Sequence, residues 1–165
     1  MVLDLRSLFV NDNESLPLDC RFDMSEVDFY GEYPLKAPVA VNGKVYSRAG
    51  IVTLSLVCDC EYSAPCDRCG VDTVKHYMVP IERVLVGKLE NGENDEIILL
   101  EDFKLDLEEL VFTEVVLAMP RKHLCNEDCL GLCQECGKNL NNGPCDCATK
   151  KIDPRLAALS KFFEN

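Results

Sequence analysis

Apolar and polar positions alternate with a period of two in several stretches between residues 39 and 100. This period predicts β-strands that bury one face. Asn42-Gly43 lies between two apolar runs and predicts a hairpin turn. No helical pattern separates the strand-like runs, so we expect an antiparallel sheet that could curl toward a barrel. The residues expected on the buried face are Val52, Leu54, Leu56, Cys58, Cys60, Tyr77, Val79, Ile81 and Leu85, and a further short strand is expected over residues 97–100.

A helical period replaces the strand period between residues 106 and 120. Asp106 is a good N-cap, Glu109 stands three residues later as in a capping box, and Pro120 ends the pattern. A second helix is predicted near the C-terminus, where Asp153 precedes Pro154. The fold class expected is therefore α+β: an antiparallel sheet packed by one central helix, followed by a cysteine-rich module and a short terminal helix.

Six of the eleven cysteines fall between residues 125 and 147. Two of them form a C-x-x-C-G motif and two form a C-x-C motif, separated by a turn-rich spacer. Four thiolates arranged this way can surround one zinc ion as a tetrahedron. The ligands expected are Cys133, Cys136, Cys145 and Cys147, with Cys125 and Cys129 as alternates that could replace one ligand or serve as reactive thiols.

A second cysteine group repeats the same motifs in the opposite order. Cys58 and Cys60 form a C-x-C pair, and Cys66 and Cys69 form a C-x-x-C-G motif. These four residues could hold a second zinc ion if the strand bends at Cys58, because a regular strand holds alternate side chains too far apart. The alternative is that Cys58 and Cys60 pack in the core. A thioredoxin-like role is disfavoured because strand-like sequence flanks the motif on both sides.

A disulfide framework is the competing explanation for so many cysteines. The odd number of cysteines and their close pairing oppose it. The first residues also lack a basic start followed by an apolar block, so we expect a reducing, cytoplasmic location. No apolar run approaches the length of a membrane span, so no membrane association is expected.

The formal net charge is −12, and it is distributed unevenly. Residues 1–120, here called the acidic body, hold 10 basic and 23 acidic residues, whereas residues 121–165, the cysteine module, hold 7 and 6. An acidic body suits a basic protein partner better than RNA, although the charge could simply maintain solubility. The cations that could contact RNA or a partner are Arg121, Lys122, Lys150, Lys151 and Arg155.

Catalytic chemistry has little support in the sequence. The two histidines, His76 and His123, fall on a strand and in a linker, apart from any recognisable nucleophile. A zinc ion with four thiolate ligands has no open position for water, and no phosphate-binding glycine loop is visible. We therefore expect a protein that is not an enzyme and has no small-molecule substrate.

The cysteine motifs also carry a family resemblance. The pattern C-x3-C-x-G-L-C-x2-C-G-x-N-L-N-x3-C-x-C, with Cys66-Asp67-Arg68-Cys69 upstream and Asp153-Pro154-Arg155 downstream, resembles the YceD family, or DUF177. The resemblance covers most of the chain from about residue 45 onward. It implies a role in the accumulation of 23S ribosomal RNA of the large subunit, and hence in ribosome biogenesis. The expected partner is a basic ribosomal protein or assembly factor; the alternatives are a thiol and zinc redox sensor or a zinc protein that binds RNA directly.

Overall fold

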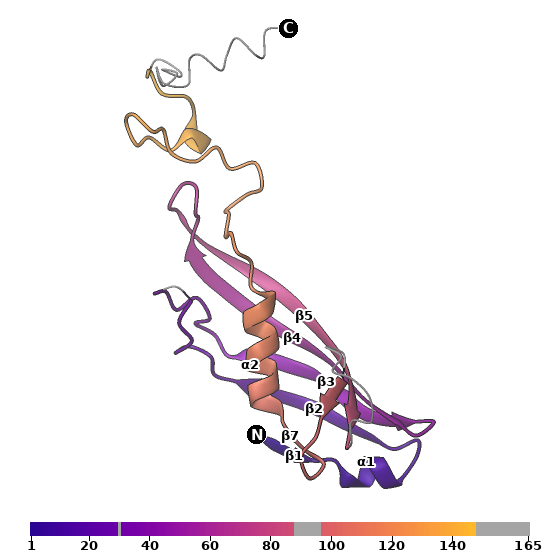
Figure 1. Ribbon diagram of the computed structural model, residues 1–165. Helices are drawn as coiled ribbons and strands as arrows, with labels where there is room; N and C mark the ends of the chain where they lie inside the picture. Colours follow the sequence, from indigo (N-terminus) through magenta and orange to yellow (C-terminus); the bar gives the residue numbers. More distant parts are fainter. Residues whose placement is uncertain (30, 88–96, 148–165) are drawn as a thin grey trace, which may run out of the picture.

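The computed structural model describes residues 1–29, 31–87 and 97–147, and its centre is a five-stranded sheet (Figure 1). The strands lie in the order β2, β3, β4, β5, β6. Their bounds are Ser15–Phe22 (β2), Val39–Arg48 (β3), Ile51–Pro65 (β4), Asp72–Val86 (β5) and Ile97–Leu99 (β6). A separate two-stranded sheet pairs β1 (Val2–Asp4) with β7 (Lys104–Asp106), and the helical elements are α1 (Arg6–Val10), α2 (Leu107–Ala118) and the 3-10 helix η1 (Leu140–Asn142).

The two longest strands, β4 and β5, have 15 residues each and form a hairpin. They pair antiparallel from Val52 opposite Leu85 to Pro65 opposite Asp72. Every second side chain of β4 from Val52 to Ala64 is buried, as the alternating sequence predicts, and in β5 the side chains of Val79, Ile81 and Leu85 are buried while that of Tyr77 is half-buried. The prediction of which face is buried is therefore confirmed, and the core lies on the face that α2 covers.

The sheet is open and mixed, which corrects two expectations. Strands β2 to β5 pair antiparallel, but β6 pairs parallel to β5, with Val84 opposite Ile97. Within the described residues, β2 and β6 are the two edges and do not pair with each other. A barrel-like sheet is not confirmed. The sequence did not reveal the parallel pairing because β6 is only three residues long and carries too little pattern to fix a direction.

Asn42-Gly43 does not form the predicted turn. Both residues lie inside β3, where Gly43 faces Leu18 on one side and Leu56 on the other. A Cβ atom on Gly43 would lie 2.2 Å from the backbone oxygen of Ser55, so glycine is needed here because the neighbouring backbone comes close. The turn between β3 and β4 occurs instead at Ala49 and Gly50, whose φ angles of 53° and 75° suit a type I′ hairpin.

Helix α2 forms as the sequence predicts. The Asp106 carboxylate accepts hydrogen bonds from the backbone amides of Glu108 and Glu109 and so caps the first turn. The apolar stripe of the helix packs against the sheet through Leu107, Val111 and Val115, which are fully buried. Figure 1 shows the helix lying across the sheet beside β4 and β5.

One ion pair joins α2 to the sheet. Arg83 of β5 donates a hydrogen bond to the carboxylate of Glu114, and the two side chains are 25% and 16% exposed. Glu114 is therefore paired within the chain rather than presented free to a partner.

The terminal helix expected at Asp153, and the cations Lys150, Lys151 and Arg155, lie outside the described residues. Among the described helices, none has both the length and the apolar character that a membrane crossing requires. The division into an acidic body and a cysteine module remains a prediction.

Candidate metal centre

Four cysteines from two distant segments meet at the tip of the β4–β5 hairpin. We call Cys66, Cys69, Cys125 and Cys129 the inner cluster; their sulfur atoms all lie within 4.8 Å of one another. The Sγ atoms of Cys69 and Cys125 are 3.6 Å apart, and those of Cys66 and Cys129 are 3.9 Å apart. A tetrahedral thiolate site with metal–sulfur bonds of about 2.3 Å has sulfur–sulfur edges of roughly 3.8 Å, whereas a disulfide needs about 2.05 Å. The inner cluster therefore has the dimensions of a metal site.

Hydrogen bonds from the residues between the first two cysteines hold the two segments together. The guanidinium of Arg68 donates to the backbone carbonyls of Glu127 (3.1 Å) and Cys129 (2.9 Å). The backbone amide of Asp67 donates to the carbonyl of His123, and the amide of His123 donates back to the Asp67 carboxylate. These contacts position the second pair of cysteines against the first.

His123 fixes the segment that precedes Cys125 against the β4–β5 hairpin. Its side chain is 3% exposed, and its Nε2 lies 2.6 Å from the hydroxyl of Thr73 on β5. The imidazole also packs on the ring of Tyr62, with the ring centres 5.0 Å apart. The segment that follows α2 is thus packed against the hairpin and does not act as a free linker.

A second set of four cysteines gathers further along the chain. We call Cys133, Cys136, Cys145 and Cys147 the outer cluster; their sulfur atoms also lie within 4.8 Å of one another. This is the set that the spacing of the motifs predicts as ligands. The spacer folds back through η1, and the amide of Cys133 donates to the carbonyl of Lys138 (2.8 Å). Turn-forming residues in the spacer bring the C-x-C pair back onto the C-x-x-C pair.

Both C-x-x-C-G motifs adopt the same loop. In each one the glycine amide donates to the carbonyl of the first cysteine: Gly70 to Cys66 (2.8 Å) and Gly137 to Cys133 (2.9 Å). The two glycines have φ angles of 68° and 72°, a conformation that other residues adopt only with strain. The loop aims backbone amides at the sulfur atom of the first cysteine.

These amides change the acidity of the thiols. Burial raises the pKa of Cys66, but backbone amides that donate to its sulfur outweigh burial and lower the pKa to about 6. Amides of Cys136 and Glu135 likewise lower the pKa of Cys133 to about 6. Each cluster thus contains one thiol that readily loses its proton. The resulting thiolate is the form that binds a metal.

A neighbouring thiol in each cluster keeps its proton. A hydrogen bond to Cys129 raises the pKa of Cys125 to about 12, and a hydrogen bond to Cys136 raises that of Cys147 to about 12. Hydrogen bonds between sulfur atoms thus favour the protonated form of one thiol in each cluster. A divalent metal would release these protons, so its binding should depend on pH.

One side chain links the two clusters. The amide nitrogen of Asn141, in η1, donates to the sulfur of Cys129 (3.2 Å) and lowers the pKa of that thiol. The side-chain oxygen of the same residue accepts from the backbone amide of Leu130 (2.8 Å). The loop of the outer cluster therefore supplies a hydrogen bond to a sulfur atom of the inner cluster, and such bonds orient the ligands of metal sites.

Cys58 and Cys60 lie apart from both clusters, so the expected grouping of these two with Cys66 and Cys69 needs correction. They are 0% and 1% exposed and belong to the core of the sheet. Burial raises the pKa of Cys58 to about 12 and that of Cys60 to about 11, so both remain neutral thiols. Their place on the buried face of β4 was already visible in the alternating pattern.

The partners of Cys66 and Cys69 are instead two cysteines that sequence reasoning assigned as alternates for the outer cluster. The signal that could have placed them is the pairing of motifs. Once four cysteines are assigned to the outer cluster, and Cys58 and Cys60 to the buried face of their strand, the remaining pairs are one C-x-x-C and one C-x3-C. The sulfur atoms of Cys125 and Cys129 thus lie with those of Cys66 and Cys69 and not with the outer cluster. Of the predicted contact cations, Arg121 and Lys122 are exposed beside the inner cluster.

Relatives of this chain are found among mycobacterial proteins. Uncharacterised proteins of Mycobacterium bovis and Mycobacterium tuberculosis are each 39% identical over 74 residues, which cover 45% of this chain and 35% of the relative. An uncharacterised protein of Mycobacterium leprae is 29% identical over 119 residues, 70% of this chain and 52% of the relative. The matches thus span about a third to a half of the relatives' own lengths. No solved structure matches the chain significantly.

A family model gives a broader match. The model described as large ribosomal RNA subunit accumulation protein YceD matches residues 54–163, about two thirds of the chain. The matched region contains most of β4, all of β5 and α2, and every cysteine of the inner and outer clusters. The chain therefore belongs to the YceD family.

Proposed function

We propose that this protein is a non-catalytic cytoplasmic factor that supports the accumulation of 23S ribosomal RNA during ribosome biogenesis. In this proposal each cysteine cluster holds one structural zinc ion. The observation that carries the proposal is the inner cluster, in which four sulfur atoms from two segments meet at tetrahedral spacing within the region that matches the family. The family description supplies the link to large-subunit RNA.

The ligand set supports a structural role for the metal. Zinc favours four thiolates in a tetrahedron, and such a site has no free position at which water could be activated. The inner cluster joins the hairpin tip to the segment after α2, so the metal would stabilise the contact between these parts of the chain. The outer cluster would stabilise a loop-rich segment whose only regular element, within the described residues 130–147, is η1.

The charge of the acidic body supports a protein partner. With 10 basic and 23 acidic residues, this part of the chain repels RNA phosphates and attracts cationic polypeptides. We therefore propose that the partner is a basic ribosomal protein or assembly factor. The five candidate cations, Arg121, Lys122, Lys150, Lys151 and Arg155, are too few to supply the phosphate contacts that RNA affinity requires.

Complementation of a strain that lacks the gene tests the proposal. The ratio of large-subunit to small-subunit RNA should fall in the deletion strain and recover with the wild-type gene. A gene carrying Cys66→Ser and Cys69→Ser should fail to restore the ratio, whereas the matched pair Cys58→Ala and Cys60→Ala should restore it. An unchanged ratio in the deletion strain would refute the RNA role. Full rescue by the Cys66 and Cys69 variant would refute the role of the inner cluster.

A further inference from the structure

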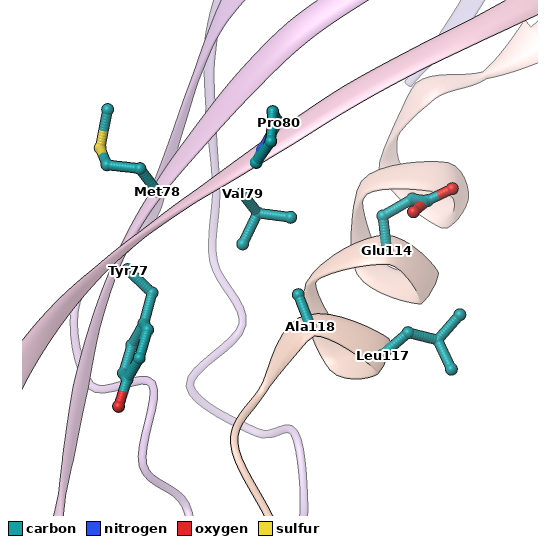
Figure 2. Close-up of a pocket in the computed structure, with 7 residues that line it drawn as sticks. All are labelled: Tyr77, Met78, Val79, Pro80, Glu114, Leu117 and Ala118. Atoms are coloured by element: carbon teal, nitrogen blue, oxygen red, sulfur yellow. The ribbon is translucent and has the colours of Figure 1, made fainter.

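Two adjoining hollows lie along the C-terminal half of α2. The first, about 360 Å³, lies between α2 and β5 (Figure 2). The second, about 620 Å³, lies between the end of α2, the end of β4 and the segment around Phe29. Leu117 lines both hollows, and it is 77% exposed. Leu117 therefore stands between the two hollows, which we together call the groove.

The first hollow is mainly apolar. Its lining includes Tyr77, Val79 and Pro80 of the strand, and Figure 2 shows Ala118 of α2 pointing toward Val79 while Leu117 projects away from the strand. The carboxylate of Glu114 is already paired with Arg83, so it contributes little free charge. This end of the groove can accept an apolar side chain.

The second hollow combines an apolar floor with an acidic rim. Tyr62 and Met119 are among the apolar residues that line it. Three carboxylates also line it, those of Asp28, Glu32 and Asp67, against a single cation. The rim therefore carries a net negative charge and favours a cationic ligand over a phosphate group.

We propose that this groove is the docking surface for a cationic segment of a partner protein, with two apolar side chains that fill the hollows on either side of Leu117. This inference rests on the proposed function and specifies the surface that the basic partner would use. Apolar contacts would supply most of the affinity, and the acidic rim would select basic sequences over acidic ones.

The inner cluster holds one wall of this groove in place. Pro120, Arg121 and His123 line the second hollow, and His123 is fixed by its hydrogen bonds to Asp67 and Thr73. The same segment continues directly to Cys125. A metal in the inner cluster would therefore keep the groove preformed, which lowers the entropy that binding must overcome.

Selection from a random peptide display library against the full-length, zinc-loaded protein tests the inference. The selected peptides should be rich in lysine and arginine next to large apolar residues. Two variants probe the groove: Leu117→Arg removes its central apolar side chain, and Glu32→Lys reverses a charge on its rim. Both residues are exposed, so neither change should disturb folding. Each variant should weaken peptide binding about tenfold or more.

Matched controls lie elsewhere on the surface. Val10→Arg makes the same kind of change at a residue that is 82% exposed at the end of α1, and Asp19→Lys reverses an exposed charge on β2. Both controls should bind the selected peptides like the wild type. Binding that is equal in all four variants would overturn the inference, as would selection of acidic peptides or of none.

Other occupants of the groove give distinct results. If a second copy of the chain occupies it, Leu117→Arg should lower the sedimentation coefficient, and this outcome would overturn the inference. Loss of binding to a ribosomal RNA fragment in the same variant would also overturn it. Failure of the deletion strain to lose large-subunit RNA would refute the proposed function alone, because peptide binding at Leu117 is measured independently of it.

Discussion

The guanidinium of Arg68 donates a hydrogen bond of 2.9 Å to the backbone carbonyl of Cys129, a residue 61 positions further along the chain. Arg68 lies between Cys66 and Cys69, so its side chain ties this motif to the backbone of Cys129. Together with the bond from Arg68 to Glu127, it makes the inner cluster depend on a residue that is not itself a ligand.

Replacing Arg68 should therefore weaken the inner cluster selectively. We expect Arg68→Ala to lower metal affinity there about tenfold, because the second pair of cysteines loses its anchor. Arg68→Lys should retain part of the affinity, since an ammonium group can also donate to these carbonyls but lacks the planar geometry of the guanidinium. Titration with Co²⁺, followed by thiolate charge-transfer absorption, measures the affinity. Arg48→Ala, an exposed change at the end of β3, is the control. Equal titration curves for Arg68→Ala and the control would contradict the prediction.

The number of bound metals should depend on which cysteines are present. Native mass spectrometry of the zinc-loaded wild type should show two ions. Cys66→Ser with Cys69→Ser should leave one ion, and so should Cys133→Ser with Cys136→Ser, because each pair belongs to a different cluster. Cys58→Ala with Cys60→Ala should still bind two. A single ion in the wild type, or loss of an ion in the Cys58 and Cys60 variant, would show that the ligand sets are wrong.

Stability should fall at alkaline pH because of the buried thiol of Cys58. Its folded-state pKa is raised from 9.0 to about 12 by burial. Between these values the unfolded chain loses the thiol proton while the folded chain keeps it, so unfolding releases a proton. The free energy of unfolding should then drop by about 1.4 kcal/mol per pH unit from this group.

Urea denaturation at several pH values above about 9 measures this slope. Cys58→Ala should cost about 1 kcal/mol at neutral pH but lose the contribution of this thiol to the slope. Identical pH slopes for the wild type and Cys58→Ala would argue that the thiol ionises equally in the folded and unfolded chains.

Gly43→Ala should destabilise the sheet strongly. The added methyl group would lie 2.2 Å from the backbone oxygen of Ser55 and 2.8 Å from the Cα atom of Leu56, so β3 and β4 would have to separate locally. We expect a loss of about 2–3 kcal/mol in the free energy of unfolding, measured by urea denaturation. Lys44→Ala, at the next and exposed position, should change it by less than about 0.5 kcal/mol. A comparable effect of the two changes would contradict the close approach of the strands.

The elements that sequence predicted well are those whose pattern is local. Alternation along β4 placed Leu54 and Leu56 on the buried face, and the N-cap at Asp106 and Pro120 bounded α2 closely. In each case the signal lies within about a dozen residues. The outer cluster could also be identified this way, because all four cysteines fall between residues 133 and 147.

The parts that sequence missed depend on contacts between distant segments. Asn42-Gly43 has the composition of a turn, but Gly43 is required by the approach of a neighbouring strand. The inner cluster joins Cys69 to Cys125, and nothing local indicates this pairing. The short spacing of Cys58 and Cys60 suggested a motif, whereas the sheet fixes these residues as part of the core.

The separation of the ligands in the inner cluster affects the order in which this protein can mature. Cys69 and Cys125 are 56 positions apart, so the first half of the site leaves the ribosome well before the second. At about 5–20 residues per second, this delay amounts to roughly 3–11 seconds of translation. During that interval the nascent chain presents two thiols with only half a coordination sphere. Correct metallation must therefore wait until β5, β6 and α2 have been synthesised, and premature oxidation of Cys66 would block it.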